Sequence, residues 1–208
     1  MTRGKFITFE GTEGVGKSTQ VKLLADYLKK TGQPYLLTRE PGGEVIAESI
    51  RKIILDAKNT SMCDEAEALL YAASRAQLVK NVILPALEEG KTVICDRYVH
   101  SSVVYQCYGR GLSEKFVLDI NAFALENCPP VLTILLELPP DVAFKRKGGA
   151  DKTDRVEQSG EQFFDRVAFG YSKIKEKDEK VLTIVPLGER EETSQTIINA
   201  LKERGLIK

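Results

Sequence analysis

Paired cysteines, tryptophan and long apolar stretches are missing from this sequence, and histidine occurs once. None of the four cysteines forms a CxxC pair, and His100 stands at no metal-ligand spacing from them, so we expect reduced cysteines. No apolar stretch approaches the length of a membrane span, and no charged leader precedes the first apolar segment. These absences predict a cytoplasmic protein with no membrane partner.

Net charge is missing too, because 30 Lys and Arg residues balance 30 Asp and Glu residues. A neutral chain has no general electrostatic attraction to nucleic acid or to a membrane surface, so we expect neither as a partner. The length of 208 residues suits one domain with a sizeable core and is short for two. We therefore expect residues 1–208 to form a single domain.

A glycine-rich segment near the start carries the clearest chemistry. Residues 5–20 read KFITFEGTEGVGKSTQ, in which GTEGVGKS matches the phosphate-binding pattern GxxxxGK[ST] between a β-prone run and a helical one. Glycine lets backbone amides turn toward a phosphate, Lys17 adds a positive charge, and the Ser18 hydroxyl suits Mg²⁺. A chance match has a probability on the order of 1%, so we expect a nucleoside triphosphate here. The loop residues are Gly11, Thr12, Glu13, Gly14, Val15, Gly16, Lys17, Ser18 and Thr19.

Strand-like and helical segments alternate along the rest of the chain. The predicted strands after the first are residues 35–38, 91–95, 131–138 and 181–186. The predicted helices are residues 20–30, 45–55, 64–89 with a kink near Pro85, 114–126, a short one around Ala143, 163–177 and 191–204. Residues 100–112 show no strong period. The alternation predicts a three-layer α/β fold, a five-stranded parallel sheet with helices on both faces.

Charged and aromatic residues stand where such a fold places ligands. Arg39 and the Asp96-Arg97 pair end predicted strands, and parallel sheets bind ligands beyond the carboxyl ends of their strands. Tyr71 and Arg75 are four residues apart on a predicted helix, so both project from one face and together suit a flat polar ring. Each feature also has a plainer explanation. Arg39 could be a solvated arginine and Asp96-Arg97 a local ion pair. Tyr71 and Arg75 could be a packed aromatic beside a surface arginine.

Residues 147–162, KGGADKTDRVEQSGEQ, are glycine-containing, dense in charge and long enough to act as a lid. An ordinary surface loop is the alternative. For His100 we favour a solvated or loop-packing role, because no serine or carboxylate arrangement suggests a triad. The strings DxxG and NKxD, which a GTPase switch needs, do not occur. These features together favour a small transferase with a lid.

Five motifs, in this order and over nearly the whole chain, resemble those of the thymidylate kinase family. They are FEGTEGVGKST at 9–19, TREPGG at 38–43, LLYAASRAQ at 69–77, DRY at 96–98 followed by YQCYGRGL, and TDRVEQ at 153–158. Members of the family transfer the γ-phosphoryl group of ATP to dTMP and give dTDP for dTTP biosynthesis. The resemblance implies this activity, with Mg²⁺ as cofactor, dTMP and ATP as substrates, and a homodimer.

The resemblance also assigns residues to the phosphates and the metal. Lys17 and the loop amides hold the phosphates of ATP, and Ser18 with Asp96 organises Mg²⁺. Arg39 and Arg97 grip the acceptor phosphate, where a planar guanidinium can make two parallel hydrogen bonds.

Around the acceptor nucleoside, the resemblance implies that Tyr71 stacks on thymine and that Tyr105 crowds the 2′ position of the sugar. Glu13 would lie near the ribose and phosphate. The polar edge of the base would be read by Arg75, Ser102 and Gln106.

A catalytic arginine occurs in the glycine loop of one group of the family and in the lid of another. Gly14 occupies the loop position here, so the resemblance directs the search to the lid, where Arg155 is the better match and Arg146 the second. The lid differs from arginine-rich examples by its Gly-Gly-Ala sequence at 148–150. The residues expected to take part in catalysis are Lys17, Arg97, Arg155, Arg146 and Glu13.

Two alternatives remain at this point. Another nucleoside monophosphate kinase or deoxynucleoside kinase would share the phosphate sites and differ only at the base. A nucleotide-binding regulator without activity would keep the glycine loop, but it would not need the arginines that grip an acceptor phosphate.

Overall fold

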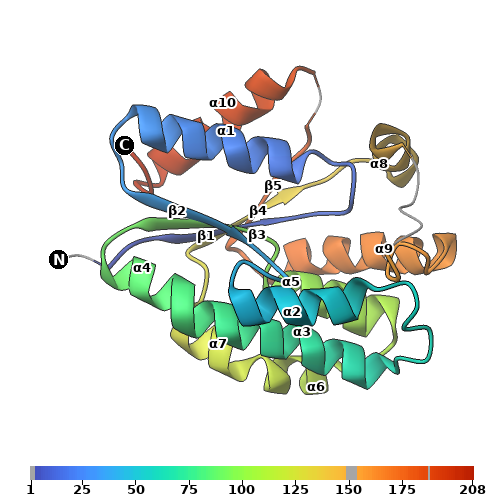
Figure 1. Ribbon diagram of the computed structural model, residues 1–208. Helices are drawn as coiled ribbons and strands as arrows, with labels where there is room; N and C mark the ends of the chain where they lie inside the picture. The colour runs from blue at the N-terminus through green and yellow to red at the C-terminus, as the bar shows by residue number, and fades with distance from the viewer. Residues whose placement is uncertain (1–2, 149–153, 187) are drawn as a thin grey trace.

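A five-stranded parallel sheet forms the middle layer of the protein (Figure 1). The computed structural model describes residues 3–148, 154–186 and 188–208. The strand order is β2-β3-β1-β4-β5, and every neighbouring pair is parallel. The strands are β1 (Phe6–Glu10), β2 (Tyr35–Arg39), β3 (Thr92–Asp96), β4 (Leu132–Leu136) and β5 (Val181–Ile184). The predicted sheet is confirmed.

Helices cover both faces of the sheet. Helices α1 and α10 lie on one face, and α3, α4, α7 and α9 lie on the other (Figure 1). The helices are α1 (Lys17–Lys30), α2 (Val45–Leu55), α3 (Asp64–Leu78), α4 (Leu84–Glu88), α5 (Val99–Ser102), α6 (Glu114–Ile120), α7 (Ala122–Asn127), α8 (Pro140–Lys147), α9 (Glu161–Lys177) and α10 (Arg190–Glu203). Two π-helical segments, η1 (Val79–Ile83) and η2 (Val103–Gly109), join α3 to α4 and follow α5.

Each face of the sheet has its own hydrophobic core. One core joins β1 and β4 to α1 and α10, and the other joins the opposite face to α3, η2, α6 and α9. Because both faces are covered, β1 and β4 are buried at every position. That double burial explains why residues 131–138 read as an almost unbroken apolar run.

One predicted helix has the break that was expected, and two other segments differ from their predictions. The helix expected at 64–89 passes through the π-helical η1 just before Pro85, whose missing N–H disturbs the regular ladder. The helix expected at 114–126 breaks at Asn121, between α6 and α7. Residues 99–109 are helical although their sequence has no strong period. Most of η2 is buried, so it has no polar face to produce a pattern.

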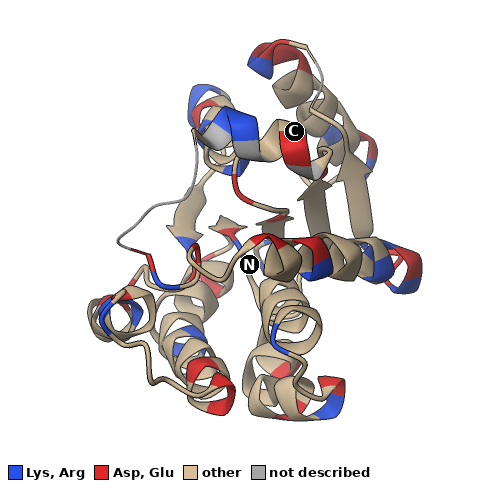
Figure 2. Cartoon of the chain, turned by 90° about the vertical axis from the view of Figure 1, so that its right-hand side faces the viewer, with Lys and Arg blue, Asp and Glu red and all other residues tan. Residues whose placement is uncertain are grey.

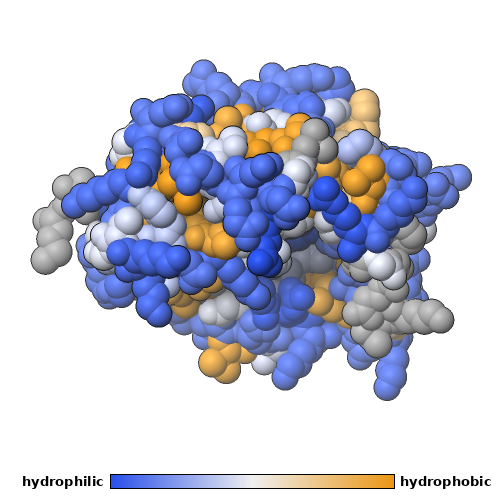
Figure 3. Space-filling view, turned by 90° about the horizontal axis from the view of Figure 1, so that it is seen from above, coloured by the Kyte–Doolittle hydropathy of each residue, from blue (hydrophilic) through white to orange (hydrophobic). Residues whose placement is uncertain are grey.

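The surface agrees with the balanced composition. Acidic and basic residues are interspersed over the helices (Figure 2), and the face above α1 and α10 is mostly hydrophilic with small separate hydrophobic areas (Figure 3). Among the described residues, no helix is both long enough and apolar enough to cross a membrane. All four cysteines are free, as expected.

Part of the predicted lid can be placed. Residues 149–153 lie outside the described residues. After them, Asp154 forms an isolated antiparallel bridge with Asp56, and the Arg155 N–H donates to the Leu55 carbonyl at 2.9 Å. The second half of the predicted lid therefore returns along the C-terminal end of α2.

Candidate active site

The glycine loop connects β1 to α1 at the carboxyl edge of the sheet. Gly11, Gly14 and Gly16 have φ of 134°, 79° and 97°, a region that favours glycine. At Gly11 the space is also restricted, because a Cβ would lie 2.3 Å from the Leu136 carbonyl oxygen. Helix α1 begins directly after this loop, at Lys17, so its free N-terminal amides stand beside it. The loop therefore has the geometry of an anion site.

Lys17 is buried within the loop. Its Nζ donates to the carbonyl oxygens of Gly11 at 2.8 Å and Thr12 at 2.7 Å. Burial, and then the nearby Arg97 cation, lower the pKa of Lys17 to about 8, although carboxylates such as Glu13 raise it. Lys17 therefore has neutral partners and lacks the full anionic counterpart that a polyphosphate would supply.

Ser18 and Asp96 meet, as the resemblance implies. The Ser18 hydroxyl donates to Asp96 Oδ2 at 3.0 Å, across the gap between α1 and the end of β3. The other carboxylate oxygen, Oδ1, is buried and has no hydrogen-bond partner. Hydroxyl and carboxylate oxygens are the donors that Mg²⁺ prefers, and an unpartnered buried oxygen is costly without a cation. The pair therefore fits a magnesium ion.

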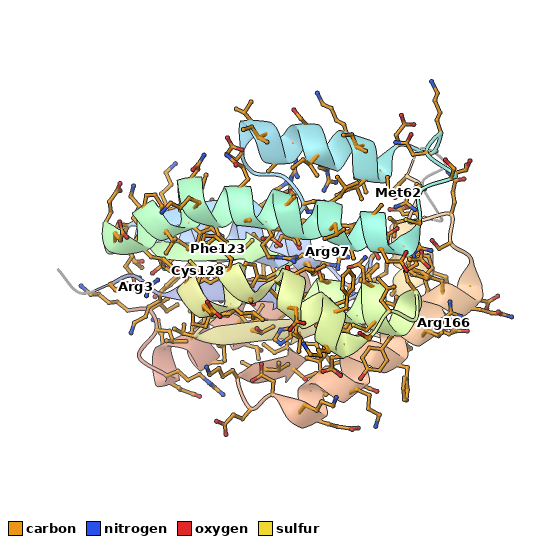
Figure 4. The ribbon with its side chains drawn as sticks, turned by 90° about the horizontal axis from the view of Figure 1, so that it is seen from below. Arg3, Met62, Arg97, Phe123, Cys128 and Arg166 are labelled. Atoms are coloured by element: carbon orange, nitrogen blue, oxygen red, sulfur yellow. The ribbon has the colours of Figure 1, made fainter. Side chains whose placement is uncertain are left out.

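Arg97 is held from several sides in the interior (Figure 4). Among the described residues it is the one non-glycine with positive φ, 74°, a conformation that the surrounding contacts must stabilise. Its guanidinium pairs with Glu13 and donates to the hydroxyl oxygens of Ser101 at 3.0 Å, Tyr171 at 3.2 Å and Tyr105 at 3.3 Å. Its orientation is thereby fixed toward the loop.

Glu13 is the loop carboxylate that faces Arg97. It also accepts a hydrogen bond from the Tyr105 hydroxyl at 2.9 Å. Burial raises the pKa of Glu13, but the combined effect of Arg97, Lys17 and the Tyr105 hydroxyl is larger and lowers the pKa to about 2. Glu13 is therefore ionised at neutral pH, and it joins the loop to the residues expected to bind the acceptor.

Glu10, the last residue of β1, is a site residue that the sequence reasoning missed. It is 1% exposed, and its Oε2 accepts from the hydroxyls of Ser101 at 2.6 Å and Tyr171 at 2.9 Å. Both hydroxyl hydrogens are then committed to Glu10, so the two oxygens can only accept from Arg97. The sequence signal was a charged residue at the end of a strand that otherwise lacks charge, directly before the loop.

A cavity of about 100 Å³ lies beside the loop, on the side of Arg97. Its lining residues come from the loop, from the segments after β2 and β3, from α2, α3 and η2, and from the chain after residue 153. They are Glu13, Glu40, Pro41, Arg51, Leu55, Tyr71, Arg75, Arg97, Ser101, Ser102, Tyr105, Gln106, Asp154, Val156, Glu157 and Phe164. The cavity is thus lined by seven of the eight residues that the resemblance assigns to the acceptor nucleotide, and Arg39 is the exception.

Arg75 is more deeply enclosed than the sequence suggested. Its side chain is 2% exposed, and its five N–H donors face protein acceptors. The acceptors are Glu40 Oε2 with two contacts of 2.6 Å, Ser102 Oγ at 2.9 Å, Asn121 Oδ1 at 2.5 Å and the Tyr98 carbonyl at 3.1 Å. Arg75 thus also forms part of the wall of the cavity, and no local sequence pattern predicts this role.

Arg39 points elsewhere in this structure. It pairs with Glu48 at 2.9 Å, donates to the Pro41 carbonyl, and does not line the cavity. Arg51 of α2 does line it and donates to the same carbonyl at 2.9 Å. Sequence reasoning missed Arg51, because an arginine on an amphipathic helix is ordinarily a surface residue.

The two lid arginines do not contact the glycine loop. Arg155 pairs with the buried Glu67 of α3, and its Nε donates to the Ile54 carbonyl at 3.0 Å. Arg146 is exposed on α8 and donates to the Pro186 carbonyl at 3.2 Å. Neither lines the cavity. Their expected catalytic role thus remains a prediction.

The loop, the sheet edge and the adjacent cavity define a P-loop protein of the α/β class with a second candidate ligand site beside the loop. A sequence model of the family described as thymidylate kinase matches residues 9–197. The thymidylate kinases of Finegoldia magna and Symbiobacterium thermophilum are each 44% identical over 97% of this chain, covering 100% and 94% of the relatives. The crystal structure of thymidylate kinase from Ehrlichia chaffeensis matches with a TM-score of 0.78 and 28% identity, covering 96% of this chain and 99% of that one. The chain belongs to the thymidylate kinase family.

Proposed function

We propose that the protein transfers the γ-phosphoryl group of ATP to dTMP and releases ADP and dTDP. The observation that carries this proposal is the Arg97–Glu13 ion pair, which joins the glycine loop to the cavity. A phosphate placed on Arg97 would stand directly beside a polyphosphate held by the loop. This proximity is what a transfer between two bound nucleotides needs.

The donor side consists of the loop amides and Lys17. ATP would replace the carbonyl partners of Lys17 with phosphate oxygens, which restores an anionic partner to a buried ammonium group. Ser18 and Asp96 would hold Mg²⁺, whose charge bridges and neutralises phosphate oxygens when it is bound. Two protein oxygens suffice, since Mg²⁺ usually takes its other ligands from phosphates and water.

The acceptor side needs no strong general base. The attacking oxygen belongs to a monophosphate that is already ionised, so the new P–O bond forms as the bond from the γ-phosphorus to ADP breaks. Arg97 holds the acceptor phosphate, and the hydroxyls of Ser101 and Tyr171 hold Arg97. Glu13 positions Arg97 and Tyr105, which lies near the sugar. Catalysis then consists of positioning and charge neutralisation.

The nucleoside would fill the rest of the cavity. Tyr71 supplies an aromatic face, Gln106 and Ser102 supply polar atoms, and Arg51 adds a cation that the sequence did not reveal. We also propose the lid arginines Arg155 and Arg146 as sources of charge for the transferred group; Arg155 would have to leave Glu67 to act there.

Homodimer formation is proposed on the same resemblance. Exposed apolar side chains on the adjoining helices α3, α6 and α7 support it, namely Leu69, Leu118 and Phe123. Phe123 is labelled on α7 in Figure 4. Light scattering that gives a monomer mass at micromolar concentration would contradict it.

Substitution of Arg97 tests the proposal at its central contact. In an ADP-release assay with dTMP, Arg97→Ala should lower kcat by about 100-fold or more, because the acceptor phosphate loses its cation. ATP affinity, measured by calorimetry, should change little. Arg204→Ala, an exposed arginine at the end of α10 and outside the cavity, serves as the control and should keep full activity. Full activity of Arg97→Ala would show that the acceptor phosphate lies elsewhere.

A further inference from the structure

Gln106 lines the cavity with an amide that is held at one end. Its Nε2 donates to Glu67 Oε1 at 3.0 Å, and both residues are almost fully buried, Gln106 at 1% and Glu67 at 0% exposure. A carboxylate only accepts hydrogen bonds, so only the nitrogen end of the amide can face it. The hydrogen bond therefore determines which way round the amide of Gln106 stands.

Glu67 is kept ionised by its other partners. Arg110 donates to Oε1 at 3.2 Å and to Oε2 at 3.0 Å, and Arg155 donates to Oε2. Burial raises the pKa of Glu67, but the hydrogen bonds from Arg110, Gln106 and Arg155 together lower it below its usual value. If the amide of Gln106 turned over, it would bring its oxygen against this buried anion. The turned orientation is therefore strongly disfavoured.

A carboxamide that is free to turn can pair with two kinds of pyrimidine. Thymine and uracil present an N3–H donor beside an O4 acceptor, whereas cytosine presents an N3 acceptor beside an amino donor. A carboxamide has one acceptor and one donor group side by side, and turning it over exchanges them. An amide that is held in one orientation can match only one of the two patterns.

We propose that Glu67 is a positioning residue that makes Gln106 selective for pyrimidines carrying an N3–H, and so excludes cytosine nucleotides. The inference rests on the proposed function, since it takes dTMP as the acceptor. In this arrangement Gln106 Oε1 accepts from N3–H, one N–H of Nε2 donates to O4, and the other donates to Glu67. Arg155 and Arg110 act through Glu67, because their hydrogen bonds hold its carboxylate in place. Arg155, which follows the predicted lid loop, thereby has a role in the observed conformation.

The test compares dTMP with dCMP as acceptors. In Glu67→Gln, residue 67 can donate as well as accept, so Gln106 becomes free to turn. The ratio of kcat/KM for dTMP to that for dCMP should fall by about tenfold or more, because an unmatched buried polar group is what rejects the wrong base. Direct binding of dCMP, measured by calorimetry, should strengthen in the same variant.

Glu10→Gln is the matched control, a buried carboxylate that serves Arg97 and not the base. It should lower kcat for both acceptors and leave the ratio unchanged. If Glu67→Gln does not fold, as judged by circular dichroism, Glu67→Asp keeps the charge but shortens the reach to Gln106, and the ratio should still fall. An unchanged ratio in a folded Glu67 variant overturns the inference. A wild-type protein that does not phosphorylate dTMP overturns the proposed function instead.

Discussion

Single side chains in this protein take their properties from the partners that the fold gives them. Ser101 and Tyr171 show this most simply. Their hydroxyl groups donate hydrogen bonds to Glu10, so their oxygens can only accept from Arg97. Lys17 shows it through its charge. Burial and Arg97 lower its pKa to about 8, and the partners of its ammonium group are neutral carbonyls.

A pH dependence of ATP binding follows from Lys17. Polyphosphate favours the protonated amine, so binding raises the lowered pKa of Lys17. Below about pH 8 the amine is already protonated, whereas above it binding must take up a proton and affinity must fall as pH rises. Calorimetry at pH 9 in buffers of different ionisation enthalpy should show uptake approaching about one proton per ATP. Uptake that persists in Lys17→Met would assign the proton to another group.

At the scale of secondary structure, the break between α6 and α7 serves the cavity wall. Asn121 stands at the break, where its Oδ1 accepts from Arg75 and its Nδ2 donates to the Val117 carbonyl at 2.8 Å. Asn121→Ala leaves a buried guanidinium N–H without a partner and should lower the free energy of unfolding by about 1–3 kcal/mol. Asn127→Ala, which removes a similar bond on an exposed helix end, should cost less. Equal losses in urea denaturation would contradict this role.

Sequence predicted the strands and the loop well because their causes are local. An apolar run covered on both faces and a glycine pattern between strand and helix both leave a direct trace. The pairing of Glu40 with Arg75, and of Glu67 with Arg155, joins residues 35 and 88 positions apart. No local pattern encodes such pairs, so the orientation of Arg75 and the position of Arg155 could not be foreseen. The buried helix at 99–109 lacked a pattern for the opposite reason, since it has no polar side.

At the scale of the whole molecule, the candidate site lies at the carboxyl ends of the strands, and different strand ends carry different parts of it. The loop after β1 and the end of β3 carry the residues that we propose for phosphate and metal binding, while α2, α3 and η2 line the cavity beside them. The chain after residue 153 lines that cavity with Asp154 and Val156, and Asp154 is bridged to Asp56 at the end of α2. Two nucleotides can therefore meet at Arg97 and Glu13 from opposite sides.

The most direct test of this account is a comparison of acceptors in an ADP-release assay with ATP and Mg²⁺. We expect the highest kcat/KM for dTMP and some turnover of dUMP, since one methyl group in an apolar pocket contributes only about 1–3 kcal/mol. UMP and dGMP should be poor acceptors, because the family resemblance places Tyr105 against the 2′ position of the sugar and the proposed base site is built for a pyrimidine. A clear preference for UMP or dGMP would contradict the account.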